Sequence, residues 1–501
     1  MRLRLRNSLL LCVALGGCAV GPGYHAPDNK LPDSFAARPV SDASSKKPVV
    51  EAAEWWKSLG DEELNGLIDR AIKANPQLDI ALTRLQEARQ QESVVIGGAL
   101  PEAEASAGGG RGTGSDLTKG RADSVLRAGD SGSGLKHITQ VYGFDAAWEL
   151  DLFGKYRREI EAAGAETEAA RAARNQVLIT LIADVVHAYV DMRGLQMQQA
   201  VLEKNLNAVK QYADVMRQRY EHGITNEFDV SLADRQLATL QAQQAPLAAQ
   251  LHASQYAIAA LLGEFPETLA AELGKPGVIP ALPQALDTGV PIDLLKNRPD
   301  IQQAERELAA ATARVGVAEA NLFPQVSLLG GAGYQGQGLG VSPAKNSFIW
   351  SVGPSVGMPI LDFGRLDALV NIADLETHEK LMRYKQAIIG AVEDVDTASS
   401  AYAGQQDRLR NLNTALEASQ KAADLASERF DRGLTDMLNV IDAQRQQFDL
   451  EQQYVMAQQA AAEQFIALYK ALGSGWQHYQ VIPPIRQPLP AVIAALARMA
   501  E

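Results

Sequence analysis

The chain repeats its own sequence. RYEHGITNEFDVSLADRQ at 219–236 is answered by RFDRGLTDMLNVIDAQRQ at 429–446, a shift of 210 residues. The same shift carries Phe153-Gly154 onto Phe363-Gly364. A duplication kept in order along most of the chain predicts a fold in which one long architectural unit is built twice.

The two copies differ in length at one place. Further upstream, 75–89 is answered by 298–312 and Pro101 by Pro324, a shift of 223 residues rather than 210. The first copy must therefore hold 13 extra residues after Pro101. A run rich in Gly, Ser and Thr at 108–134 has the composition of a loop and accounts for them.

The N-terminus has the features of an export signal. Three arginines precede an apolar run that ends in Leu-Gly-Gly-Cys, with the cysteine at position 18. A basic region, a short apolar region and small residues before a cysteine predict a signal peptide at 1–17 and lipid on Cys18, as diacylglycerol and a fatty acyl chain. The only other cysteine, Cys12, lies in the removed segment, so the mature chain has no pair for a disulfide. An ordinary signal peptide with an incidental cysteine is the alternative.

Charge and hydropathy restrict the partners. Removal of residues 1–17 takes three arginines from a formal net charge of −13 and leaves −16, which argues against nucleic acid as a partner. No mature stretch approaches the 18 or so apolar residues of a membrane-spanning helix. A lipoprotein that crosses a membrane with β-strands alone belongs in an outer membrane.

Long helices dominate both copies. From 155 to 221 no proline interrupts a composition rich in Ala, Glu, Gln, Arg and Leu, and apolar residues recur at a spacing of three and four. We expect long helices at 155–221 and 365–431, return helices at 227–262 and 437–472, and shorter helices at 77–98 and 299–321. His222-Gly223 ends the first long helix, and Thr225 or Asn226 begins the next.

A hairpin of β-strands is expected in each copy, at about 102–151 and 325–361. Apolar residues alternate with small or polar ones: Tyr142, Phe144, Trp148 and Leu150 fall on one face, and Gly143, Asp145 and Glu149 on the other. This alternation, with aromatic residues near strand ends, is typical of transmembrane β-barrels, although half-buried strands of a soluble sheet would share it. Four strands cannot close a barrel and open edges are not tolerated in lipid, so three copies that supply 12 strands are the economical ring.

The residues resemble a family at several specific blocks. CAVGPGYHAP at 18–27 is similar to the mature start of outer-membrane efflux lipoproteins, and 295–328, with Arg298-Pro299-Asp300 and Phe323-Pro324, resembles their most distinctive block. The Arg-aromatic-x-x-Gly-x-Thr turns at 219–225 and 429–435 resemble their periplasmic tips. The chain resembles an outer membrane factor, a TolC-like channel of the NodT-type lipoprotein branch of tripartite RND-type efflux systems, over nearly all of 18–473.

The resemblance implies a fold and partners. The fold is mainly α with a transmembrane β part: an internally duplicated protomer that forms a homotrimer, with a 12-stranded β-barrel in the outer membrane and a long α-helical coiled-coil barrel in the periplasm. The protein would be a passive exit duct for drugs and toxic amphiphiles, supplied by a periplasmic adaptor and an inner-membrane RND-type transporter. The division is a signal peptide (1–17), a lipidated extended segment (18–60), repeat 1 (61–273), repeat 2 (274–473) and a C-terminal tail (474–501).

The helix tips carry the candidate sites. Asp214 and Asp424 each lie nine residues before a tip glycine, and a ring of aspartates near this depth narrows the entrance in the family. Arg217 could hold these carboxylates as a latch, although aspartate is equally ordinary on a solvated helix face. Gly223, Thr225, Gly433 and Thr435 are the expected docking surface for the adaptor, while helix capping alone would also account for them.

The sequence contains none of the enzyme motifs that we looked for. The seven histidines are scattered without HExxH spacing, and neither CxxC nor the Walker A pattern occurs, so we expect no enzyme, no metal site and no cofactor besides the lipid. Two alternatives to drug efflux remain. The same fold could serve type I protein secretion, or the chain could be a lipid-tethered periplasmic coiled-coil scaffold, which would leave the strands unexplained.

Overall fold

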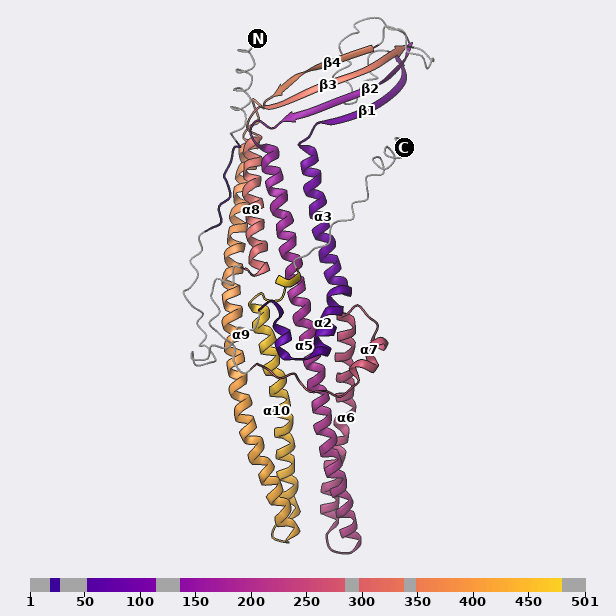
Figure 1. The fold of residues 1–501 in the computed structure, drawn as a ribbon, viewed down its shortest axis with the longest axis vertical. Helices are drawn as coiled ribbons and strands as arrows, with labels where there is room; N and C mark the ends of the chain where they lie inside the picture. Colours follow the sequence, from indigo (N-terminus) through magenta and orange to yellow (C-terminus); the bar gives the residue numbers. More distant parts are fainter. Residues whose placement is uncertain (1–18, 28–51, 114–135, 284–296, 338–347, 480–501) are drawn as a thin grey trace. The chain divides into compact units, whose positions relative to one another are not determined.

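A computed structural model describes residues 19–27, 52–113, 136–283, 297–337 and 348–479 (Figure 1). The expected signal peptide, Cys18, most of the Gly-rich run and most of the C-terminal tail lie outside these ranges.

Contacts divide the chain into two compact units, and each unit takes residues from both sequence copies. Of the described residues, unit 1 comprises 19–27, 84–113, 136–171, 303–337 and 348–385, and unit 2 comprises 52–83, 172–283, 297–302 and 386–479. The repeat therefore describes the sequence, whereas packing joins matching parts of the two copies.

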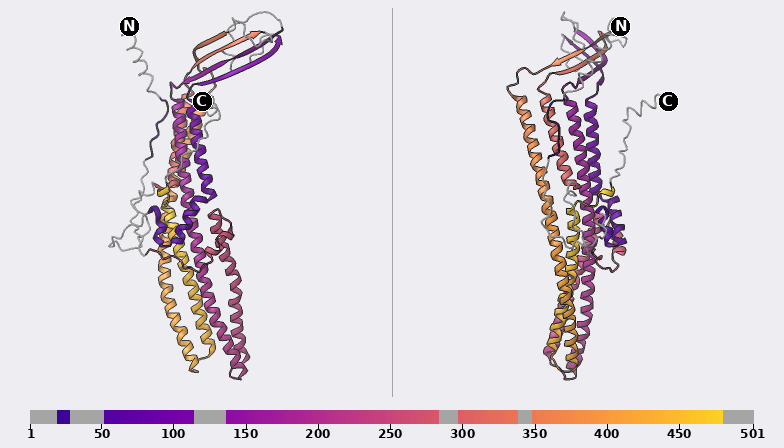
Figure 2. Two further views of the ribbon diagram at one scale, coloured as in Figure 1. Left: turned by 45° about the vertical axis from the view of Figure 1, so that its right-hand side comes forward. Right: turned by 60° about the vertical axis from the view of Figure 1, so that its left-hand side comes forward.

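Unit 1 contains one antiparallel sheet of four strands in the order β1-β2-β3-β4 (Figure 2). The strands are β1 (Glu102–Thr113), β2 (Lys136–Leu150), β3 (Gln325–Gln337) and β4 (Phe348–Gly357). Glu102 pairs with Ala147 in the first hairpin, and their equivalents Gln325 and Gly357 pair in the second. The two hairpins thus share one register, as expected if both descend from one unit.

Helices of unit 1 pack through small side chains. They are the later part of α3 (Pro76–Gly98), most of α8 (Pro299–Ala320) and the first turns of α5 (Lys155–Glu221) and α9 (Arg365–Asp431). Ala165 of α5 and Ala309 and Ala310 of α8 are buried together, with Tyr24 packed against them.

Unit 2 holds the helical hairpins. α6 (Glu227–Leu261) follows α5 and α10 (Met437–Ala471) follows α9, and Ala213 and Met216 of α5 are buried with Ala233 of α6 and Met437 and Val440 of α10. The shorter elements are η1 (Ala52–Leu59), α2 (Glu62–Ala74), α7 (Pro266–Leu273) and η3 (Gln477–Tyr479). The long and return helices occupy the residues expected from the sequence, but α7 and both 3₁₀ segments were not expected.

In unit 2, an equivalent side-chain contact holds the C-terminal end of each return helix, and we call each of these two contacts a corner. Asn75 donates through Nδ2 to the carbonyl oxygen of Leu261 at 2.7 Å, and Arg298 donates through Nη1 to the carbonyl oxygen of Ala471 at 2.5 Å. Asn75 and Arg298 are 223 residues apart and the two acceptors 210, so these contacts are equivalent. Each corner satisfies a carbonyl left free at the end of a return helix.

Glycine is required at both corners. Gly263 and Gly473 follow the return helices with φ of 68° and 67°. A Cβ on Gly263 would lie 2.6 Å from the carbonyl oxygen of Ala74, and one on Gly473 would lie 2.6 Å from Cγ of Arg298. Both the left-handed backbone and the close approach exclude larger residues.

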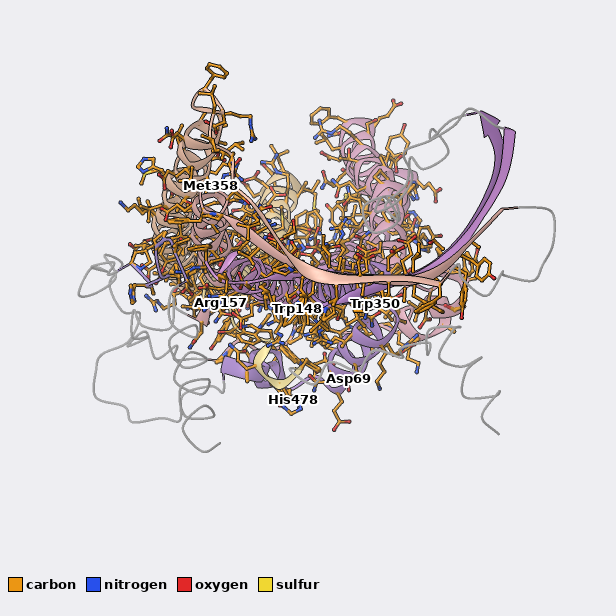
Figure 3. All side chains as sticks on the ribbon, turned by 90° about the horizontal axis from the view of Figure 1, so that it is seen from above. Asp69, Trp148, Arg157, Trp350, Met358 and His478 are labelled. Carbon is orange, nitrogen blue, oxygen red and sulfur yellow. The ribbon has the colours of Figure 1, made fainter. Side chains whose placement is uncertain are left out.

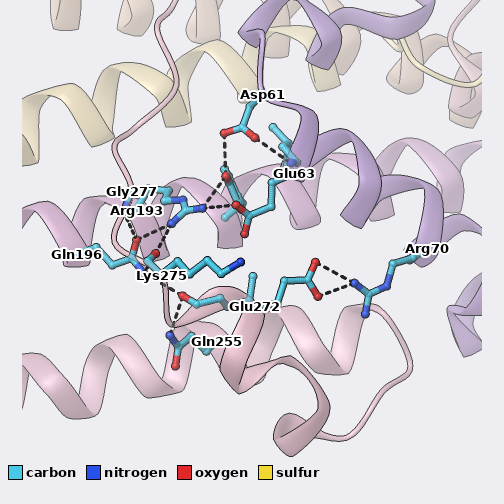
Figure 4. A network of polar contacts seen from close by, with 12 residues as sticks. Asp61, Glu63, Arg70, Arg193, Gln196, Gln255, Glu272, Lys275 and Gly277 are labelled. Atoms are coloured by element: carbon cyan, nitrogen blue, oxygen red, sulfur yellow. Dashed lines mark hydrogen bonds and ion pairs between the residues drawn. The ribbon is translucent and has the colours of Figure 1, made fainter.

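A polar network fastens α2 and the segment after α7 to α5 in unit 2 (Figure 4). Arg193, only 4% exposed, donates to Glu63 at 2.7 Å and to the Lys275 carbonyl oxygen at 2.9 Å. Gln196 donates to the carbonyl oxygen of Leu273 at 2.9 Å. A buried guanidinium with several acceptors fixes the chain that meets it, because moving any acceptor away would leave a polar group unpaired.

Within the described ranges, no helix combines the length and the hydropathy that a bilayer span requires.

Candidate functional site: an amphipathic sheet and two helix tips

The sheet of unit 1 carries an exposed apolar face. Pairing brings Tyr142 opposite Tyr334, Trp148 opposite Leu328 and Trp350 opposite Ala332, so these residues share one face. Phe144 is 70% exposed and Trp350 68%, and Trp148 and Trp350 are labelled in Figure 3. A soluble sheet would cover such residues with a second layer, whereas aromatic side chains on an exposed strand face suit lipid.

The opposite face is small and acidic. Glu104 of β1 stands opposite Asp145 of β2, and Gly143 opposite Gly333 of β3. A Cβ on Gly143 would lie 2.7 Å from the carbonyl oxygen of Ala332, so the strands approach more closely than any side chain permits. This face borders a hollow of about 270 Å³, lined in part by Glu102, Glu104 and Glu149. The alternation expected from the sequence is therefore present, with a polar side and an apolar side.

The two tips in unit 2 end with the same cap. Gly223 and Gly433 have φ of 72° and 69°. Ile224 N donates to the carbonyl oxygen of Arg219 at 2.8 Å, and Leu434 N donates to that of Arg429 at 2.8 Å. These are Schellman caps, in which glycine takes the left-handed position.

The return helices begin shortly after the tip threonines. Asn226 caps α6 by accepting from Asp229 N at 3.0 Å, while the Thr225 hydroxyl donates to Asp229 Oδ2 at 2.6 Å. In the second copy Asn439 donates to the Thr435 hydroxyl at 2.9 Å. Of the two predicted caps, Asn226 is therefore the observed one, and each threonine braces the first turn of its helix.

Apolar side chains stand exposed at equivalent positions of both tips. Ile224 is 71% exposed and Leu434 63%, and Phe228 and Leu438 are 67% and 59% exposed. An apolar residue commonly follows the glycine of a Schellman cap, but the turns leave most of the surface of these four side chains uncovered. The sequence pattern pointed to the glycines and threonines of the tips and did not reveal these apolar neighbours.

The predicted gate residues differ between the copies. Arg217 Nη1 lies 2.7 Å from Asp214 Oδ1 and Nη2 lies 2.6 Å from Asp234 Oδ1, so this arginine joins α5 to α6. Asp424 is exposed and forms no ion pair with any described residue. The equivalents of Arg217 and Asp234 are Ser427 and Gln444, so the second copy cannot form the same pair.

The segment after Cys18 is held against unit 1. Val20 N donates to the carbonyl oxygen of Phe153 at 3.0 Å, and Arg158 donates to the Gly21 carbonyl oxygen at 3.0 Å. A Cβ on Gly154 would lie 2.6 Å from Cα of Ala19. Ala19 therefore lies at the turn between β2 and α5, and Cys18 itself lies outside the described residues.

An open sheet with one lipid-like face, in a chain of long paired helices whose tips present matching turns, defines a channel protein of the outer membrane. The family model of outer membrane efflux proteins matches residues 67–264 and 290–474. The chain belongs to the outer membrane efflux protein family.

Relatives and solved structures agree with this membership. Nodulation protein T of Rhizobium leguminosarum bv. viciae is 30% identical over 480 residues, with 95% of this chain and 94% of the relative covered. The toluene efflux pump outer membrane protein TtgC of Pseudomonas putida is 28% identical, with 92% and 93% covered. The outer-membrane channel OprN superposes with a TM-score of 0.81 at 36% identity, covering 92% of this chain and 100% of its own.

The comparisons confirm the expected duplicated, mostly helical protomer with a strand part, and the expected role as an efflux duct in a Gram-negative outer membrane. The relatives and the fold are those of transport proteins.

Proposed function

We propose that three copies of this chain form one exit duct, whose strands close into a single sheet through the outer membrane. The observation that carries this proposal is the open sheet with an apolar face. In the described structure β1 and β4 each pair with one neighbour, and unpaired strand edges are not stable in lipid. Further copies of the same chain remove both edges at once, because β4 of one protomer can pair with β1 of the next.

The duplication predicts the register of this pairing. Within one chain, the last strand of the first copy (β2) pairs with the first strand of the second copy (β3), and Trp148 stands opposite Leu328 in this pairing. The equivalents are Met358, just after β4, and Ala105 of β1. Phe153 also stacks on Phe323 with ring centroids 4.8 Å apart, while its equivalent Phe363 is 91% exposed. An aromatic ring left so exposed fits a contact completed by the next protomer.

Cysteines at Ala105 and Met358 are expected to cross-link neighbouring protomers into covalent trimers, because directly opposite Cβ atoms lie about 4.5–5.5 Å apart. The measurement is non-reducing electrophoresis after mild oxidation, and the predicted loss of Cys12 leaves no competing thiol. A Glu104/Met358 cysteine pair is the matched control, since Glu104 points to the opposite face and should not react. Equal cross-linking of both pairs, or none of either, would contradict the predicted register.

The lipid on Cys18 would anchor the channel at the boundary between sheet and helices. Ala19 lies beside Gly154, at the turn where β2 gives way to α5. This is where the lipid-like face of unit 1 ends, and an acyl chain that starts one residue earlier would enter the bilayer there. One or two acyl chains add to membrane anchoring without replacing the strands.

The tips would dock a periplasmic adaptor, which links the duct to an inner-membrane RND-type transporter. The exposed Ile224 and Leu434 lie beside the predicted docking residues Gly223, Thr225, Gly433 and Thr435 and would supply the apolar contact. Exposed apolar residues at equivalent turns suit a repeating partner surface. The duct would carry drugs and other small amphiphiles, as the names of the toluene and antibiotic efflux relatives suggest.

Deletion of the gene is expected to raise accumulation of a fluorescent amphiphile several-fold in cells, and wild type should reverse it. The Cys18→Ala form should restore efflux in part, since strands still hold it in the membrane. The Ile224→Asp/Leu434→Asp form should assemble as wild type but fail to restore efflux, because a charged tip cannot bury in the adaptor. If no dye accumulates on deletion, small-molecule efflux is wrong and protein secretion becomes the better proposal.

A further inference from the structure

Three side chains that can ligate a metal converge between α5 and α10 in unit 2. They are His187 and Asp191, one turn apart on α5, and Glu463 on α10. One ligand atom from each residue lies within 4.8 Å of the other two. Spacing within the sequence could not reveal this group, because Glu463 comes from the other copy.

A neighbouring amide positions both carboxylates. Gln459 Nε2 donates to Asp191 Oδ1 at 2.7 Å and to Glu463 Oε1 at 3.1 Å. His187 Nδ1 lies 3.2 Å from Asp191 Oδ2. Ligating side chains in metal sites are oriented in the same way, by a second layer of hydrogen bonds.

Among the described residues, the imidazole of His187 is the only group paired with these carboxylates that can carry positive charge. No lysine or arginine of the described chain forms an ion pair with Asp191 or Glu463, and the nearby Lys470 pairs with Asp184 at 3.5 Å. Two half-buried carboxylates that repel one another are stabilised by a cation between them.

We propose that His187, Asp191 and Glu463 bind a divalent transition-metal cation, with Zn²⁺ as the best match. One imidazole nitrogen and two carboxylate oxygens, with water in the remaining position, suit this ion at ligand distances of about 2.0–2.2 Å. Ligands around such an ion lie about 3.3 Å apart, so only small side-chain rotations are needed. The bound ion would fasten α5 of the first copy to α10 of the second.

The equivalent position in the duplication, between α9 and α6, has no such group of ligands. The equivalents of His187, Asp191 and Glu463 are Thr397, Ala401 and Ala253. The duplication therefore does not repeat the proposed site, and we expect one metal ion to bind per chain.

Titration calorimetry of Zn²⁺ into the purified mature protein, with its affinity tag removed, tests the proposal. We expect one saturable site per chain, and at least about tenfold weaker binding in H187A and in E463Q. H252A is the matched control, because His252 lies on α6 and its ring nitrogen faces the Gln255 side chain rather than a carboxylate. Circular dichroism and the trimer band on gels would verify that all variants fold.

Two outcomes would overturn the metal site. One is the absence of saturable Zn²⁺ binding to the wild type. The other is a stoichiometry that stays the same in an H187A/E463Q double variant as in H252A. Neither depends on transport, so the efflux proposal stands or falls separately.

Discussion

Replacement of Arg298 by alanine is expected to destabilise the folded protein by about 3 kcal/mol or more, enough to remove most of it from the outer membrane. Arg298 is 6% exposed, donates to the Ala471 carbonyl oxygen, and pairs with Asp300 at 2.7 Å and Asp394 at 3.0 Å. Its removal leaves two carboxylates close together and a helix-end carbonyl without its donor. The measurement is the thermal midpoint of the purified protein, together with its amount in outer-membrane fractions.

The equivalent contact at Asn75 and an exposed arginine allow the destabilisation caused by Arg298→Ala to be compared with two smaller expected losses. Asn75→Ala removes the equivalent contact and the cap of α3, where Asn75 Oδ1 accepts from Gln77 N at 2.8 Å, but no charge. A cost of about 1–2 kcal/mol follows. Arg410→Ala, at an arginine whose side chain is 72% exposed, should cost about 0.5 kcal/mol or less. A midpoint for Arg298→Ala as high as that for Arg410→Ala would mean that the corner does not hold the fold.

Replacement of Arg217 by alanine is expected to raise the open probability of the channel several-fold in planar bilayers. Arg217 separates Asp214 from Asp234, and without it the two carboxylates repel one another across α5 and α6. All three side chains are about half exposed, so each pair is worth only about 0–1 kcal/mol. Ion pairs of this strength would break readily if the two helices were drawn apart. Cells should also become sensitive to a large hydrophilic antibiotic such as vancomycin.

An arginine of α10 provides the matched control for Arg217. Arg445 pairs with Asp442 of the same helix, α10, at 3.0 Å. Arg445→Ala therefore removes one positive charge without breaking this kind of ion pair between two helices. The open probability of the Arg445→Ala channel should match that of the wild type. The exchange Arg217→Asp with Asp234→Arg should close the channel again, and the wild type should open more readily at 1 M salt, where the screening length is about 3 Å. Unchanged gating in Arg217→Ala would remove Arg217 from the gate.

The elements could be predicted from the sequence because their signals are local. The heptad spacing and tip glycines determine α5 and α9 to the residue, and the alternation in 142–150 identifies the exposed aromatic face of β2. Such signals repeat at fixed intervals, and the duplication presents each of them twice.

Contacts across elements could not be predicted in the same way. Asp234 lies 20 residues after Asp214, and only the closed hairpin brings it to Arg217. Glu463 reaches His187 from the other copy, and Arg193 finds its acceptors on α2 and beyond α7. None of these pairs follows a spacing rule, because each depends on how two helices are rotated against one another.

The latch between α5 and α6 is present in one copy only, since Ser427 and Gln444 replace its charged members in the other. A trimer built from these protomers would therefore have six hairpins of two kinds in alternation around its axis. If the hairpins move apart on opening, the first copy must separate Arg217 from Asp234, whereas the second copy has no equivalent pair to separate. The entrance would then widen in two stages, and a recording of single channels should contain an intermediate level between shut and fully open.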